Sequence, residues 1–268
     1  MFQQFFGMDA MPFSKSIATD DVLATSSLKE LVARLTMAVR ERGIGLVTGD
    51  IGSGKSTAVR AFLASLDPNK YICVHLVCPL NSPSALYRAI LVALNQPLPF
   101  GPTAQIALIR TTLADLVNNR KIPLVIIDEA HLLPAAVIDP LRTLLAADLD
   151  SKSLAALILI GQSDVKRMLQ LSTLQAFAQR ITAKVQLEPL SLEATLAYIQ
   201  HHLKVAGLSD GITIFADDAL RRIADYTLGT PRRINLLCTA ALIAAAADKK
   251  KIVDDIAVRR AINDLEHE

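Results

Sequence analysis

The sequence is poor in aromatic residues, with no tryptophan, four tyrosines and 4% aromatics in 268 residues. Proteins that hold single-stranded nucleic acids stack the bases on aromatic side chains, so a platform of that kind is not expected here. Cysteine is scarce as well. Cys73, Cys78 and Cys238 match the spacing of neither a disulfide framework nor a zinc site. We expect three buried thiols in a reducing compartment.

Long hydrophobic runs are also missing. The N-terminal MFQQFFGMDAMPF has neither the basic start nor the apolar run of a signal peptide. The longest apolar tract, residues 236–247, is interrupted by Cys238 and Thr239 and is shorter than the about 20 residues that span a bilayer. These absences predict a cytoplasmic protein without a membrane segment.

Charge of one sign is not in excess, because the net charge is only +2. Basic pairs occur late in the chain, but from His201 onward ten basic residues are matched by ten acidic ones. Solvated helix faces are therefore favoured over a nucleic-acid patch, which stays open as the alternative. Hydrophobic residues make up 51% and are mainly aliphatic, which favours helices packed on a buried parallel sheet.

The most informative stretch reads GDIGSGKST and fits the phosphate-binding loop G-x-x-x-x-G-K-[ST] of nucleoside triphosphatases. In such a loop the glycines allow backbone N–H groups to converge on an anion at a helix N-terminus. Lys55 would reach the β- and γ-phosphates, and the Ser56 hydroxyl would bind Mg²⁺. The residues expected to contact the nucleotide are Gly49, Asp50, Ile51, Gly52, Ser53, Gly54, Lys55, Ser56 and Thr57.

The surroundings of this motif agree with it. An apolar run at residues 44–47 predicts a strand before the loop, and apolar residues at helical spacing from Ala58 to Leu66 predict a helix after it. Strand, glycine-rich loop and helix are the required order. The alternative is a glycine turn in another α/β fold.

A second motif, LVIIDEAH, ends a strand predicted at residues 123–128. Asp128 is expected to hold Mg²⁺ at the carboxyl end of this strand, and Glu129 to orient and deprotonate the attacking water. The alternative is an acidic helix start. His131 completes the DEAH string of some helicases, but the chain has no room for a second motor domain. We therefore interpret His131 as an ordinary residue early in a helix.

Two polar residues follow later elements of the predicted sheet. Gln162 comes after the apolar strand at residues 154–160, where it would sense the γ-phosphate or the water, unless it only ends the strand in a turn. Arg180 lies between a helix and the strand at residues 181–186, where a cation satisfying the last helix carbonyls is the plain alternative.

The chain divides into three predicted parts. Residues 1–40 form an irregular segment and a helix, residues 41–188 the α/β core, and residues 189–268 a small all-α lid after the sequence LEPL. In the lid, Ser191 and Asp254-Asp255 are predicted helix caps, and Pro231 is expected in the first turn of a helix that carries Arg232. The predicted fold class is α/β, a P-loop parallel sheet flanked by helices and followed by a helical lid.

Taken together, these stretches resemble the AAA+ ATPases, and in particular the ExeA-like family, whose relatives include the transposition helpers TnsC, TniB and MuB. The resemblance rests on FFGMDAMPF, GDIGSGKST, LVIIDEAHLL, and QRITAKVQLEPLS through GTPRRIN. It implies ATP and Mg²⁺ as cofactors, Gln162 as the first sensor and Arg180 as an arginine finger reaching a neighbouring subunit. It further implies that Arg232 is the lid sensor and that Pro12 and Phe13 lie near the adenine.

The resemblance also implies a function. We expect an ATP hydrolase that forms a homo-oligomeric ring or filament, binds duplex DNA without sequence preference, and recruits or activates a transposase or related recombinase. Secretion members of the family carry a membrane span and a cell-wall-binding region after the lid, which this sequence does not continue into. A secretion or cell-envelope ATPase and a nucleotide-gated scaffold with little turnover are the alternatives.

Overall fold

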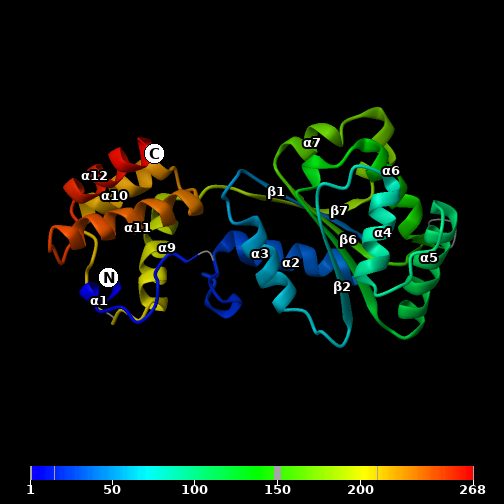
Figure 1. The fold of residues 1–268 in the computed structure, drawn as a ribbon, viewed down its shortest axis with the longest axis horizontal. Coiled ribbons are helices and arrows are strands. Elements are labelled where there is room, and N and C mark those ends of the chain that lie inside the picture. The colour runs from blue at the N-terminus through cyan, green and yellow to red at the C-terminus, as the bar shows by residue number, and fades with distance from the viewer. Residues whose placement is uncertain (1, 15, 148–151, 210, 268) are drawn as a thin grey trace. The chain divides into compact units, whose positions relative to one another are not determined.

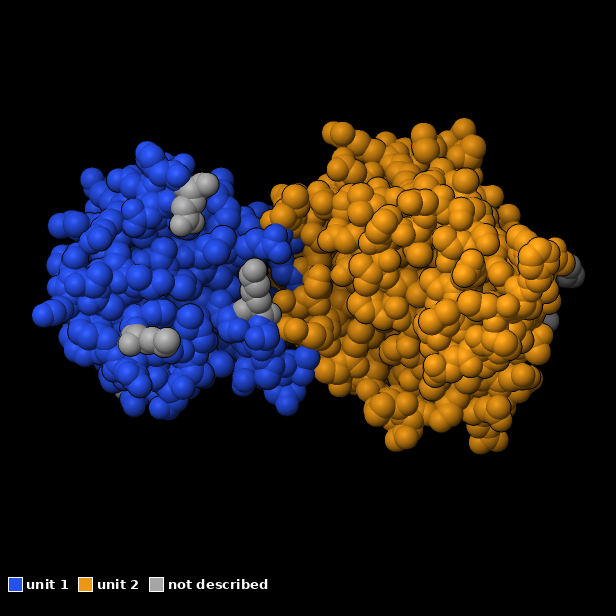
Figure 2. All heavy atoms as spheres, in the orientation of Figure 1, with its two compact units in different colours: residues 1–25, 52–54, 188–268 blue, residues 26–51, 55–187 orange. Residues whose placement is uncertain are grey.

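The computed structural model describes residues 2–14, 16–147, 152–209 and 211–267. The chain forms two compact units, coloured separately in Figure 2. The sheet unit comprises residues 26–51 and 55–187, and the helical unit comprises residues 1–25, 52–54 and 188–268. Each unit is described by itself below.

The sheet unit, which holds the labelled strands β1, β2, β6 and β7 in Figure 1, is built on five parallel strands. Their order is β2-β3-β6-β1-β7. Their bounds are β1 Ile44–Gly49, β2 Tyr71–Val77, β3 Ile122–Asp128, β6 Ala156–Gly161 and β7 Ile181–Leu187. The inner strands β3 and β6 are buried along almost their whole length, whereas the edge strands β2 and β7 alternate between exposed and buried residues. A continuous apolar run thus becomes an inner strand because both of its faces are covered by helices.

Helices cover both faces of this sheet. Alternate residues of β3 and β6 point into two clusters, one shared with α2 Ser26–Arg40 and α3 Lys55–Ala64, the other with α4 Pro83–Ala93, α5 Pro102–Asn118 and α6 Ala135–Leu145. The short helices α7 Asp164–Met168 and α8 Gln175–Ala178 contribute to the second cluster. The predicted parallel sheet flanked by helices is confirmed.

Two features of the sheet unit were not predicted. Helix α6 contains Pro140 and has no side-chain cap at Pro134, so the usual sequence signals of a helix are missing. The short antiparallel pair β4 Ala146–Ala147 and β5 Lys152–Ser153 follows it. One expectation is wrong: Cys73 is exposed, because it lies at an outward position of the edge strand β2.

The helical unit contains α9 Leu192–Val205, α10 Asp217–Thr227, α11 Pro231–Ala247 and α12 Asp255–Glu266, together with the N-terminal helix α1 Phe2–Phe6. Two predicted caps are confirmed, since the Ser191 and Asp254 side chains accept hydrogen bonds from the backbone N–H groups of Ala194 and Ala257 at 3.2 and 2.9 Å. Pro231 opens α11 as predicted.

The N-terminal segment differs from its prediction. Phe6, Met8 and Phe13 are buried among the helices of the helical unit, whereas residues 26–40 form α2 against the sheet. Residues 1–40 therefore do not form a separate part, since their apolar side chains are divided between two cores. Among the described residues, no helix has the length and apolarity needed to cross a membrane.

Candidate functional site

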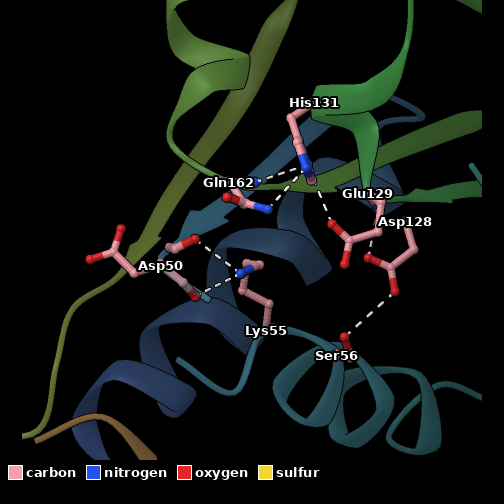
Figure 3. A network of polar contacts seen from close by, with 8 residues as sticks. Asp50, Lys55, Ser56, Asp128, Glu129, His131 and Gln162 are labelled. Atoms are coloured by element: carbon pink, nitrogen blue, oxygen red, sulfur yellow. Dashed lines mark hydrogen bonds and ion pairs between the residues drawn. The ribbon is translucent and has the colours of Figure 1, made fainter. Parts of the chain in front are cut away.

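The candidate site lies where three neighbouring parallel strands end. Strand β6 pairs with β1 on one side and β3 on the other, so their carboxyl ends reach the same edge of the sheet. Asp50 follows β1, Gln162 follows β6, and Asp128 ends β3. Figure 3 shows these side chains with Lys55 and Ser56 from the start of α3. The sheet order thus brings together two motifs that lie more than seventy residues apart in the sequence.

The phosphate-loop motif forms a turn between β1 and α3. Gly52 and Gly54 have φ values of +82° and +90°, which favour glycine, whereas Gly49 ends β1 and needs no such conformation. Lys55 is only 8% exposed, and its Nζ donates to the carbonyl oxygens of Gly49 and Asp50, each at 2.9 Å. The loop therefore folds around the ammonium group and presents the N-terminus of α3.

Other loop residues have different surroundings. Ile51 is 64% exposed, and the buried Ser53 Oγ has no hydrogen-bond partner among the described residues. The Gly52 carbonyl accepts a hydrogen bond from the Arg232 N–H at 3.2 Å, and a Cβ on Gly52 would lie 2.7 Å from the Arg232 Cβ. Gly52 is thus required both for its backbone conformation and for this close approach.

Asp128 and Ser56 face one another. Ser56 Oγ lies 3.5 Å from Asp128 Oδ2, which is longer than a normal O–H···O hydrogen bond and leaves both oxygens able to take another partner. The other carboxylate oxygen, Oδ1, accepts the backbone N–H of Glu129 at 2.8 Å. This bond supports the left-handed conformation of Glu129, which has a φ of +54°.

These residues fit a magnesium–nucleotide complex. Mg²⁺ is usually bound by one or two protein oxygens together with substrate phosphates and water, and a hydroxyl and a carboxylate oxygen face each other here. The described residues include no group of three or more His, Cys, Asp and Glu side chains that could hold a metal by themselves. The buried Ser53 hydroxyl is a further polar atom that a bound group could satisfy.

His131 makes contacts that the sequence analysis did not predict. It lies in the 3-10 turn Ala130–Leu132, with Nδ1 3.3 Å from Glu129 Oε2 and Nε2 3.0 Å from Gln162 Nε2 (Figure 3). The helical turn agrees with our interpretation of an early-helix residue, but these two contacts were not predicted. The DEAH string pointed to His131 as a residue of interest. Its contact with Gln162 depends on the pairing of strands β3 and β6, which no local sequence pattern predicts.

Two further features shape this part of the site. A Cβ on Gly161 would lie 3.1 Å from the His131 backbone nitrogen and 2.7 Å from Val165, so glycine allows the turn to approach β6.

Cys78 follows β2, and its N–H donates to the Asp128 carbonyl at 3.4 Å. Burial, helped by the Asp128 and Glu129 charges, raises the pKa of the Cys78 thiol and keeps it protonated.

The remaining predicted residues are placed as follows. Arg180 is half-buried between α8 and β7, and Arg232 is exposed in the first turn of α11. Pro12 and Phe13 are buried, and the Phe13 ring stacks on His202 of α9 with 5.4 Å between ring centroids. The roles suggested for these four residues stay predictions.

In each of the basic runs late in the chain, at least one residue lies beside an acid or a ring. Asp255 pairs with Arg222 and Arg259, Asp254 pairs with Lys250 at 2.7 Å, and Asp248 pairs with Arg260 at 3.1 Å. Arg233 lies over the Tyr226 ring, and Lys251 over the Phe5 ring. Such pairs are common on solvated helix faces, so they support the choice that the charge balance favoured, which stays a prediction.

Comparison with known proteins agrees with the fold. Residues 38–169 match the family model of the AAA domain. Across 255 residues the chain is 36% identical to General secretion pathway protein A of Aeromonas hydrophila, an alignment that takes 92% of this chain but only 45% of that protein. The chain thus spans less than half the length of this curated relative.

Similar solved structures agree at the level of the fold. Cdc6p from Pyrobaculum aerophilum has a TM-score of 0.72 at 18% identity, covering 94% of this chain and 70% of that one. The Drosophila ORC bound to DNA has a TM-score of 0.70 at 16% identity (97% and 65%), and the Thermotoga maritima RuvB Holliday junction branch migration motor has 0.61 at 17% (97% and 73%).

The fold and these comparisons show that the chain has the AAA-type P-loop fold, as the sequence predicted. Within that class, the alignment makes 92% of the chain similar to 45% of General secretion pathway protein A. Membership among the transposition helpers TnsC, TniB and MuB stays a proposal.

Proposed function

We propose that this protein hydrolyses ATP with Mg²⁺. The observation that carries the proposal is the convergence of Lys55, the facing oxygens of Ser56 and Asp128, and the Glu129 carboxylate at one edge of the sheet. Lys55 and the backbone N–H groups at the start of α3 would hold the β- and γ-phosphates. Mg²⁺, held by Ser56 and Asp128, would neutralise charge on the phosphate oxygens.

The chemistry left to the protein is the activation of water. Glu129 accepts a proton as water attacks the γ-phosphorus and the bond to the β–γ bridging oxygen breaks. Its carboxylate is part of a chain of polar contacts that ends on Gln162, which supports Gln162 as the first sensor. Glu129 is half-buried, so water can reach it.

The test is phosphate release by the wild type, by Lys55→Ala, and by Lys29→Ala, which removes an exposed lysine on α2 as a matched control. Lys55→Ala removes a charge-assisted contact worth about 1.5–3 kcal/mol, so ATP affinity should fall at least about tenfold and turnover should disappear. The Lys29→Ala protein should behave as the wild type. Equal turnover in all three proteins would show that hydrolysis occurs elsewhere.

We further propose that the ATPase works as a ring or filament of identical subunits. Arg180 would act as the arginine finger in a neighbour's site, Arg232 as the lid sensor, and Pro12 and Phe13 as neighbours of the adenine. The resemblance to AAA+ ATPases is the support for these roles.

We propose two alternative cellular roles for this ATPase. A cytoplasmic helper that binds duplex DNA and recruits a transposase is the function that the transposition resemblance implies, and the structure of a similar fold, the Drosophila ORC, is of a complex bound to DNA. A secretion or cell-envelope ATPase is favoured by the 36% identity to secretion pathway protein A. The pairing of the late basic residues with acids weakens the first candidate.

Binding to duplex DNA separates the two candidates. A DNA helper should bind duplex DNA only with ATP, without sequence preference, and more weakly as salt rises, because phosphate contacts release counterions. It should prefer duplex over single strand, since stacking aromatics are scarce. No binding at low salt with ATP, or binding that does not respond to salt, would leave the secretion-type candidate.

A further inference from the structure

His131 connects two residues that would otherwise act independently. Its Nδ1 lies 3.3 Å from Glu129 Oε2, and its Nε2 lies 3.0 Å from the Gln162 side-chain nitrogen. The Gln162 backbone N–H also approaches Nδ1, but at the longer distance of 3.4 Å. The imidazole is largely buried, with 12% of its side chain exposed, so its ring nitrogens depend on these neighbours.

The hydrogen-bond inventory of imidazole decides which contacts coexist. Gln162 Nε2 carries only donors, so the His131 Nε2 that faces it at 3.0 Å must accept and cannot carry a proton. The neutral ring then carries its proton on Nδ1, which donates to the Glu129 carboxylate. The Gln162 backbone N–H also points at Nδ1, at 3.4 Å, and this contact is satisfied only in the other tautomer, in which Nδ1 accepts.

The opposite arrangement uses the same atoms. If the Gln162 amide turns its carbonyl toward the ring, His131 Nε2 must carry the proton and donate. Nδ1 then becomes an acceptor, which can take the Gln162 backbone N–H, while its lone pair faces the Glu129 carboxylate and no longer holds it. The proton moves from one ring nitrogen to the other through water, and the net charge of the ring does not change.

We propose that His131 is a positioning residue that transmits the orientation of the Gln162 amide to Glu129 through its tautomer. The inference rests on the proposed ATPase function, in which Gln162 directs its amide donors toward the γ-phosphate. In the free protein Gln162 donates to His131, and His131 holds Glu129 by a hydrogen bond. When the Gln162 donors turn to the phosphate, its carbonyl faces the ring and Glu129 is released to accept a proton from water.

The experiment is nitrogen NMR on histidine-labelled full-length protein, because the protonated and unprotonated ring nitrogens give separate signals. The His131 signals are assigned by their loss in His131→Gln. We expect the proton on Nδ1 in the free protein and on Nε2 after addition of a non-hydrolysable ATP analogue. Magic-angle-spinning spectra serve for any nucleotide-bound assembly too large for solution spectra.

Two variants separate transmission from a merely structural role. In free Gln162→Glu protein the carboxylate can only accept, so the His131 Nε2 should be protonated without nucleotide. In Lys55→Ala, ATP should leave the proton on Nδ1, because the nucleotide is not bound. A merely structural role for His131 would leave the proton on Nδ1 when the ATP analogue binds to the wild type, so the nucleotide-dependent shift is the readout that separates the two.

The outcomes distinguish this inference from the proposed function. A proton on Nε2 in the free wild type, or on both nitrogens, overturns the relay whether or not ATP binds. Binding and hydrolysis of ATP with the proton still on Nδ1 overturns the relay and leaves the ATPase intact. Failure to bind ATP at all, measured by calorimetry, overturns the proposed function and the relay with it.

Discussion

At the scale of single residues, Asp128 has two tasks at once. Its Oδ2 faces Ser56, while its Oδ1 accepts the Glu129 N–H at 2.8 Å and supports a left-handed backbone that non-glycine residues adopt rarely. Replacing Asp128 by alanine would therefore disturb the metal site and also the direction of the Glu129 side chain.

His202 predicts how stability depends on pH. Burial, followed by the nearby His201 charge, lowers the pKa of His202 to about 4. The folded state therefore favours neutral His202, and the unfolded chain binds more protons between pH 6.5 and 4. Stability should fall by about 2 kcal/mol from this residue as the pH drops from 7 to 5.

Urea unfolding of the wild type and of His202→Phe at both pH values measures this contribution. Phenylalanine can keep the packing against Phe13 but cannot take a proton, so the loss of stability on going to pH 5 should shrink. His201→Gln is the control and should keep most of the wild-type dependence, because burial is the larger cause. The same pH dependence in His202→Phe would assign the effect to other groups.

At the scale of elements, the junction between α10 and α11 depends on Gly229. Its φ is +68°, its carbonyl accepts the Leu190 N–H at 2.9 Å, and an added Cβ would lie 2.0 Å from the Leu190 carbonyl oxygen. The end of α10 is thereby held against the segment that leads into α9. A side chain at this position must displace the backbone.

Gly229→Ala should destabilise the protein by about 3 kcal/mol or more, measured by chemical unfolding. Gly7→Ala is the matched control, because Gly7 also has a positive φ, +75°, but an added Cβ would meet nothing within 4 Å. The control should cost only the backbone strain of about 1–2 kcal/mol. Equal losses in the two variants would show that the approach of Leu190 does not matter.

The elements also show what the sequence could predict. The inner strands, the helix after the phosphate loop and the Ser191 and Asp254 caps follow from local patterns of apolar and capping residues. Helix α6 was missed because Pro140 lies inside it. The His131–Gln162 contact and the burial of Phe6 and Phe13 in the helical unit depend on which elements pack together, which no local pattern records.

At the scale of the whole molecule, the proposed ATPase requires more than one subunit. If Arg180 serves the site of a neighbour, Arg180→Ala should lower turnover while sparing ATP affinity more than Lys55→Ala does. Each variant alone should be nearly inactive in hydrolysis. The two defects would lie in different subunits of the same interface.

Mixing the Lys55→Ala and Arg180→Ala proteins should restore activity, because some interfaces combine an intact loop with an intact arginine. Recovery of phosphate release should increase with protein concentration, since such a site exists only in the oligomer. Subunit exchange is followed in parallel with fluorescently labelled protein. Exchange without recovery at any ratio would return Arg180 to the role of a cation at a helix end.

The most direct measurement for the account as a whole compares ATP affinity with phosphate release in Glu129→Gln. The amide keeps the size of the carboxylate but cannot accept the proton, so turnover should fall by about 100-fold or more while ATP affinity stays within about threefold. Glu41→Gln, which changes an exposed glutamate after α2, is the matched control and should behave as the wild type. Undiminished phosphate release by Glu129→Gln would contradict the proposed mechanism.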